Sequence, residues 1–158
     1  MKIRTRDYGE VEVDAASIIN FDDGIIGFEE CHDYILLDGG DDMSPFKCLQ
    51  SIDDCDLAFM LLDPFVVRPD YEAEIGDDAA ARLSIDSDED IAVFVIVVVP
   101  DDVKQMSFNL KAPIIINARA KKGAQYIVDN GDYSVRHYLA DEIERLKRQA
   151  PDKGRAAV

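Results

Sequence analysis

A run of nine apolar residues, IAVFVIVVV at positions 91–99, constrains the fold of this chain more than any other feature. Most of its side chains are β-branched, and such side chains pack well on a pleated sheet but lose rotational freedom in a helix. The run is much shorter than the roughly 18–20 apolar residues that a membrane span needs. Because apolar and polar residues do not alternate within it, both faces of the strand should be covered. We therefore predict a central strand in a well-developed core.

Short apolar segments recur along the rest of the chain and are separated by turn-forming residues, which is the pattern of β-strands. The predicted strands cover residues 2–7, 11–13, 18–21, 34–37, 46–52, 57–62, 71–75, 106–110, 114–117 and 125–128. Lys122 and Gly123 indicate a turn before the last strand, and Asn130 and Gly131 indicate a turn after it. So many short strands favour a mainly β domain, a small antiparallel barrel or sandwich.

Two segments carry helical signals instead. Asp77 and Asp78 precede a series of helix-forming residues, which predicts an N-cap and a short helix near residues 77–83. A second helix is predicted near residues 139–150, because apolar residues recur there every three or four positions, at Leu139, Ile143, Leu146 and Ala150. We expect a β domain over residues 1–139, followed by a C-terminal helix and a frayed tail over residues 140–158.

The charge of the chain is strongly acidic and unevenly distributed. The formal net charge is −16 at pH 7. Residues 1–103 contain 6 basic and 27 acidic side chains, whereas residues 104–158 contain 11 basic and 6 acidic ones. Such a chain should repel nucleic acid and anionic membranes and attract basic partners, although high net charge also serves solubility alone.

The three cysteines, Cys31, Cys48 and Cys55, show no close pairing. An odd number without a spacing pattern indicates reduced thiols, and no signal peptide is apparent, so we expect a cytoplasmic protein. Cys48 and Cys55 flank a predicted hairpin, and we interpret both as small apolar residues of the core.

Signals for catalysis or for a cofactor are weak. Residues 86–90 begin like a calcium loop, but Ile91 and Val97 stand where that loop requires glycine and glutamate. Cys31, His32 and His137 could supply zinc ligands, but they lack the spacing of structural zinc sites. Nucleophile elbows and phosphate-binding glycine loops do not occur in the sequence. We therefore expect neither an enzyme nor a bound cofactor.

The best clue to identity is a block framed by two asparagines, NLKAPIIIN at positions 109–117. It resembles the hallmark of the FliW family of flagellar assembly factors. Other family motifs are resembled in the same order by FDDGIIGFE at 21–29, LQS at 49–51, DLAF at 56–59, Asp63-Pro64, PDY at 69–71, DY at 132–133 and RH at 136–137. Ile26, Ser134 and Tyr138 depart from the pattern, since each replaces a usual proline. The resemblance covers residues 2–139.

The resemblance implies a non-enzymatic switch. FliW-type proteins are small, barrel-like and cytoplasmic, and they bind flagellin and the translational repressor CsrA. Flagellin sequesters the FliW-type protein until flagellin is exported. The freed protein then binds CsrA, which releases the flagellin messenger. An acidic protein suits an RNA-binding repressor, because such a repressor should carry a basic surface.

We expect the binding surface on the acidic N-terminal two-thirds of the chain. The candidate contact residues are Asp53, Asp54, Asp70, Glu72, Glu74, Asp86, Asp88 and Asp90. The motif residues are expected to form scaffold, namely Gly24, Gly27, Phe28, Asp63, Pro64, Asn109, Lys111, Pro113 and Asn117. Asn109 and Asn117 have two interpretations: they bond backbone groups at strand ends, or they line a partner groove.

Two rival functions stay open at this point. One is a barrel that holds a small molecule, since closed barrels often enclose a ligand. The other is a metal-dependent enzyme built around Cys31 and His32.

Overall fold

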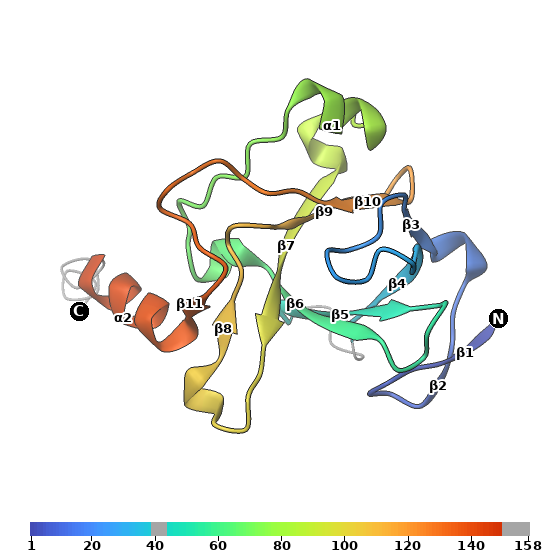
Figure 1. Ribbon diagram of the computed structural model, residues 1–158, viewed down its shortest axis with the longest axis horizontal. Helices are drawn as coiled ribbons and strands as arrows, with labels where there is room; N and C mark the ends of the chain where they lie inside the picture. Colours follow the sequence, from blue (N-terminus) through green and yellow to red (C-terminus); the bar gives the residue numbers. More distant parts are fainter. Residues whose placement is uncertain (39–43, 150–158) are drawn as a thin grey trace, which may run out of the picture.

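A computed structural model describes residues 1–38 and 44–149, and within these ranges seven strands close into a barrel (Figure 1). The strands follow one another in the order β7-β6-β5-β4-β3-β10-β9. The last strand, β9, also pairs with the first, β7, and this pairing closes the barrel. All neighbours are antiparallel except β3 and β10. The barrel strands are β3 (Ile19–Phe21), β4 (Asp33–Leu37), β5 (Phe46–Ser51), β6 (Ala58–Leu62), β7 (Ile91–Val98), β9 (Ile114–Asn117) and β10 (Lys122–Gln125).

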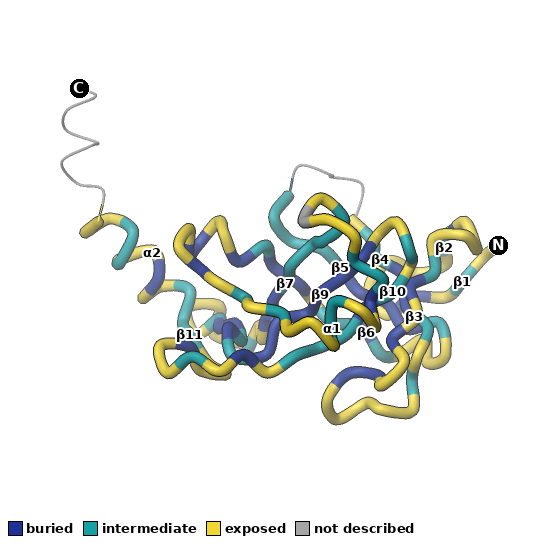
Figure 2. The backbone as a smooth tube through the Cα atoms, turned by 90° about the horizontal axis from the view of Figure 1, so that it is seen from above, coloured by how far each residue is buried: buried dark blue, intermediate teal, exposed yellow. Residues whose placement is uncertain are grey.

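Short elements extend the barrel on two sides. An N-terminal hairpin of β1 (Lys2–Arg4) and β2 (Glu10–Glu12) lies at one end, and β8 (Ser107–Phe108) and β11 (His137–Tyr138) continue the sheet beyond β7. The α-helices are α1 (Asp77–Arg82) and α2 (Leu139–Gln149). The 3₁₀ turns are η1 (Ala15–Ser17), η2 (Pro64–Val66), η3 (Asp88–Asp90) and η4 (Val103–Gln105). Figure 2 shows α2 projecting from the body, largely exposed. No helix among the described residues is long and apolar enough to cross a membrane.

Strand β7 separates two apolar cores, which explains its unbroken apolar sequence. Ala92, Phe94 and Ile96 pack against the core inside the barrel, around Phe21, Tyr34, Leu49 and Leu61. Val93, Val95 and Val97 pack against a second core outside it, around Tyr71, Phe108, Leu110 and Tyr133. Because successive side chains of a strand point to opposite faces, a strand between two cores must be apolar at every position.

The prediction of a covered central strand is therefore confirmed in part: Val95 and Val97 are buried, residues 91–94 and Ile96 are half-buried, and the end of the run is uncovered. Val98 and Val99 are 59% and 44% exposed. One edge of β7 is shared: residues 91–94 pair with β9 and residues 97–98 pair with β8. The apolar run thus continues past the point where the two cores end.

Most of the other predicted elements are present, but the first strand already ends at Arg4 and some later strand predictions are wrong. Residues 71–75 form no strand, because the Tyr71 side chain enters the second core and the backbone N–H of Glu72 donates to the Tyr133 hydroxyl at 3.0 Å. The strand predicted at 106–110 is only Ser107–Phe108, since the Asn109 side chain folds the following backbone into a turn.

The last predicted strand is shifted towards the N-terminus. Lys122 and Gly123 lie inside β10, and the turn before it occupies residues 118–121, with Lys121 at φ +58°. Gly123 serves packing here, because a Cβ at this position would lie 2.5 Å from the Phe21 ring. The turn at Asn130 and Gly131 is confirmed, with turn geometry at residues 131–132.

Both helices are confirmed, with corrections in detail. The N-cap of α1 is Gly76, and Asp77 and Asp78 lie in the first turn, where carboxylates favour the helix dipole. The expected apolar face of α2 is correct only in part: Leu139 packs against the second core and Leu146 is half-buried, but Ile143 is 43% exposed and Glu142 is buried instead. Ala150 and the predicted tail lie outside the described residues.

Candidate functional site

Two of the predicted acidic contact residues pair with a neighbouring arginine. Arg119 lies 3.1 Å from a carboxylate oxygen of Asp86 and 3.4 Å from one of Asp90. Hydrogen bonds from Arg119, together with one from the backbone N–H of Asp86, lower the pKa of Asp90. Asp88 lies in η3 between them, and its side chain is outside the described part of the chain. This acidic run is therefore tied into a local cluster with partly neutralised charge.

Asp53 and Asp54 organise the turn between β5 and β6. The Asp53 carboxylate accepts hydrogen bonds from the backbone N–H groups of His32 and Asp33, at 2.9 and 3.1 Å. The Asp54 carboxylate accepts one from the N–H of Asp56 at 3.0 Å. Both carboxylates thus have local structural partners while remaining exposed to solvent.

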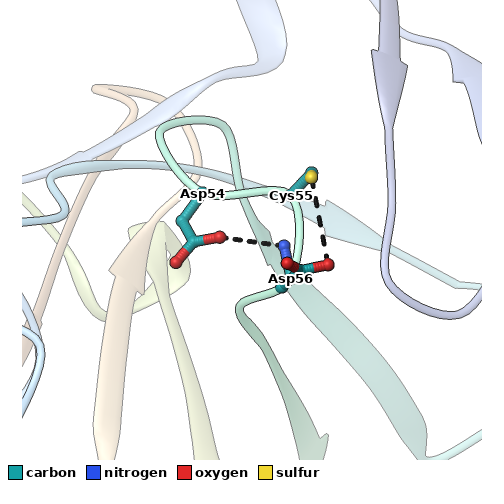
Figure 3. Close-up of side chains that lie close together, drawn as sticks. All are labelled: Asp54, Cys55 and Asp56. Carbon is teal, nitrogen blue, oxygen red and sulfur yellow. Dashed lines mark hydrogen bonds between the residues drawn. The ribbon is translucent and has the colours of Figure 1, made fainter.

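The same turn holds the one group of described side chains close enough to share a metal ion, Asp54, Cys55 and Asp56, whose ligand atoms lie within 4.8 Å of one another (Figure 3). Cys55 is exposed, so its predicted core position is wrong, whereas Cys48 is buried as predicted. Among the described residues, Cys31, His32 and His137 do not come close enough together to form such a group. His137 instead stacks on Phe108 in the second core.

Asp70, Glu72 and Glu74 lie on a different side of the molecule from Asp53 and Asp54. The segments that carry these two sets leave opposite ends of β6, and Figure 1 shows them on opposite sides of the barrel. A strand rises about 3.3 Å per residue, so proximity in sequence does not keep the ends of a strand together. The candidate contact residues Asp53 and Asp54 therefore do not share a surface with Asp70, Glu72 and Glu74.

Glu72 and Glu74 are exposed and line a hollow that we call the acidic groove. Its volume is about 380 Å³, and its other lining residues are Ile75, Gly76, Ile127, Val128, Asp129 and Asn130. Asp70 precedes Glu72 by two positions in the sequence and forms an ion pair at 3.4 Å with Arg145 of α2.

A second hollow of about 370 Å³, which we call the apolar groove, was not predicted. Ile25, which belongs to the barrel core, lines it together with Ala112 and with Phe59 and Ile96, which are partly buried and pack against that core. Its exposed apolar residues are Ile26, Val98, Ile127 and Val135, which are 59%, 59%, 67% and 66% exposed. Ile26 and Val98 are far in sequence from each other and from Ile127 and Val135, so no local sequence pattern indicates that the four residues meet.

The two amide side chains that line the apolar groove are engaged with the backbone. The Asn109 carbonyl oxygen accepts hydrogen bonds from the N–H groups of Lys111 and Ala112, both at 3.0 Å. Gln125 accepts from the N–H of Ile26 at 2.9 Å and donates to the carbonyl of Ala112 at 3.2 Å. Asn109 therefore bonds the backbone, as in the first interpretation, and it also lines this hollow.

The glycine motif shapes one rim of the apolar groove. Gly24 and Gly27 adopt φ values of +68° and +91°, which favour glycine, and a Cβ on Gly24 would lie 2.7 Å from the Cα of Glu29. The tight turn places Phe28 edge-on against Phe59, with ring centroids 5.3 Å apart. Ile26 projects from this turn into solvent and is 59% exposed.

The other motif residues lie within the scaffold. Asp63 caps η2 by accepting from the N–H of Phe65 at 3.0 Å, and Pro64 is buried in that turn. Pro113 is buried directly before β9. The fully buried Asn117 side chain bonds the backbone at Leu83, Ser84, Arg119 and Ala120.

Comparisons with known proteins agree over most of the chain. The family model described as FliW protein matches residues 2–139. A flagellar assembly factor FliW of Caldicellulosiruptor saccharolyticus is 45% identical over 141 residues, covering 89% of this chain and 91% of that protein. One of Alkaliphilus metalliredigens is 39% identical over 157 residues, covering 99% and 97%.

A solved structure agrees as well. The crystal structure of a flagellar assembly factor FliW superimposes with a TM-score of 0.81 at 36% identity, and the match covers 88% of this chain and 96% of that one. The chain therefore belongs to the FliW family of flagellar assembly factors.

Proposed function

We propose that this protein is a non-enzymatic regulator that binds flagellin and a CsrA-type translational repressor in the cytoplasm. Flagellin occupies it until export; the freed protein then binds the repressor, and flagellin translation resumes. The observation that carries the proposal is the family match over residues 2–139. The net charge of −16 supports it, because an acidic protein approaches a basic, RNA-binding surface quickly.

The interior of the barrel favours protein binding over the binding of a small molecule. The rings of Phe21 and Tyr34 meet edge-on at 5.2 Å inside it, and Leu49, Leu61 and Ile114 are fully buried around them. Side chains therefore occupy the space in which larger barrels hold a ligand.

The direct test is to mix the purified protein with CsrA and, separately, with flagellin of the same species, and to measure complex formation by calorimetry at low salt. We expect a complex with each. A third mixture contains CsrA and a labelled flagellin leader RNA. Added protein should release the RNA without binding RNA itself. Failure to bind either protein partner would show the proposal to be wrong.

A further inference from the structure

The acidic groove and the apolar groove are neighbours that share a wall. Ile127 lines both hollows, and its side chain is 67% exposed. The segment from Gln125 to Asp129 supplies residues to both of them. Together they give an apolar half and an acidic half that meet at Ile127, each within the range of about 300–1,000 Å³ typical of binding pockets.

The two halves favour different chemistry. The apolar half exposes Ile26, Val98 and Val135, while the polar atoms of Asn109 and Gln125 are engaged in backbone hydrogen bonds. An occupant gains there mainly by burying apolar side chains. Lys111 is the charged residue that lines this half.

The acidic half presents the carboxylates of Glu72, Glu74 and Asp129. All three residues are exposed, and none forms an ion pair with another described side chain. Basic side chains placed beside these carboxylates would complete charge pairs, whereas acidic ones would be repelled. A nucleic acid or a second copy of this chain, with its net charge of −16, is disfavoured for the same reason.

We propose that the two grooves together dock one amphipathic helix of a partner protein. The helix presents an apolar stripe to the apolar groove and lysine or arginine side chains to the acidic groove. Helical side chains at i, i+3 and i+4 share a face, so an apolar and a basic stripe lie side by side along one helix and match two hollows with a common wall. The inference deepens the proposed function, on which it rests, by naming the surface and the chemistry of its partner.

A fluorescein-labelled peptide tests the chemistry. It has about 18 residues, enough to form a helix on binding, with leucines on one face and lysines beside them. One control peptide shuffles the same residues, and another replaces each lysine with glutamate. We expect the patterned peptide to bind at least about tenfold more tightly than either control. Equal binding of the patterned and shuffled peptides would overturn the proposal.

Matched variants test the place. Ile127→Glu puts a charge on the shared wall and should weaken peptide binding by about tenfold or more, because the charge would be buried by the helix. Val103→Glu is the control: Val103 is 64% exposed in η4 and lines neither groove. It should change binding by less than about twofold. Unchanged binding by Ile127→Glu would contradict the inference.

A second pair of variants tests the acidic half. Glu72→Gln with Glu74→Gln removes two charges from the acidic groove, and Glu30→Gln with Glu89→Gln removes two exposed charges outside it. The first pair should weaken peptide binding more than the second at low salt, and the difference should shrink at high salt. Equal losses of affinity in the two double variants would show that the peptide responds only to the net charge of the protein. That result would overturn the assignment of basic side chains to the acidic groove.

The same variants with whole partners separate this inference from the proposed function. If the wild-type protein binds CsrA or flagellin and Ile127→Glu binds both equally well, the groove assignment is wrong while the proposed function stands. If the wild-type protein binds neither partner, the proposed function is wrong. The peptide experiment then still tests whether the two grooves bind an amphipathic helix. Analytical sedimentation of the wild-type protein alone tests whether a second copy of the chain occupies the grooves. A dimer that Ile127→Glu dissociates would identify a second copy instead.

Discussion

Asn117 shows how one buried amide joins three segments of the chain. Its nitrogen donates to the carbonyls of Leu83 and Ser84 at 2.8 and 3.1 Å, and its oxygen accepts from the N–H groups of Arg119 and Ala120, both at 3.0 Å. The side chain therefore fastens the end of α1 to the β9–β10 turn. A polar residue at the end of an apolar strand serves here to satisfy backbone groups that would otherwise be buried without partners.

Asn117→Ala should lower the free energy of unfolding by about 2–4 kcal/mol, because it leaves several backbone groups without hydrogen bonds. Asn20→Ala is the matched control, since Asn20 is exposed and its amide bonds only one carboxylate oxygen, of Asp33, at 3.1 Å. Its loss should stay below about 1 kcal/mol. Urea denaturation measures both, and equal losses would contradict the structural role of Asn117.

His137 makes stability depend on pH. Its Nε2 accepts a hydrogen bond from the N–H of Ser134 at 2.9 Å, which requires that nitrogen to be unprotonated. Burial lowers the pKa of His137, Arg68 lowers it further, and Glu142 opposes the shift. The folded protein thus binds this proton less readily than the unfolded chain. The stabilisation is present above the ordinary imidazole pKa of about 6.5 and is lost as pH falls through the lowered folded pKa.

We therefore expect the free energy of unfolding to fall between about pH 7 and pH 5, and to fall less in His137→Gln, whose amide can still accept the Ser134 bond. Denaturation midpoints over this range provide the measurement. His32→Gln, which changes the other histidine of the chain, is the control. Identical slopes in all three proteins would remove His137 as the cause.

Helix α2 shows how an element can dock by charge where its sequence suggests an apolar face. The apolar spacing correctly predicts that the segment is helical, but beside Leu139, which packs against the second core, the buried residue is Glu142. Its carboxylate lies 2.7 Å from Nη2 and Nε of Arg68, and both residues are buried. The guanidinium also lies over the Tyr133 ring, 5.7 Å from its centroid. Sequence spacing did not indicate this, because the partner lies 74 positions away.

Glu142→Ala should lower the free energy of unfolding by about 3–5 kcal/mol, since it leaves the buried Arg68 charge without its partner. The double variant Arg68→Met with Glu142→Leu should recover most of this loss, because apolar groups of similar size need no ion partner. Asp70→Ala, which breaks the exposed pair with Arg145, is the control and should lose at most about 1 kcal/mol. A loss in Glu142→Ala no larger than that of the control would show that the buried pair does not hold α2.

At the scale of the whole molecule, the negative charge is concentrated in the first two thirds of the chain, since residues 1–103 have a net charge of −21 and residues 104–158 one of +5. This charge acts over distances of about 10 Å at moderate salt and is screened at high salt. Under the proposed function, it speeds the encounter with a basic partner, while the apolar groove determines how long the complex lasts.

We therefore expect the association rate with CsrA to fall about tenfold or more as salt rises from about 50 mM to about 500 mM, while the dissociation rate changes much less. Stopped-flow fluorescence or surface plasmon resonance measures both rates. An association rate that does not respond to salt would exclude steering by the acidic surface, without bearing on the groove.

Local patterns in the sequence determined which segments form strands and helices, because side-chain spacing and backbone preference act over a few residues. They also carried the motifs by which the family could be recognised. Only the tertiary structure decided that the strands close into a barrel, that β7 separates two cores and that the predicted acidic residues form separate surfaces. It alone brought Ile26, Val98, Ile127 and Val135 together at the apolar groove, because contacts between distant segments depend on how the sheet closes and leave no periodic signal in the chain.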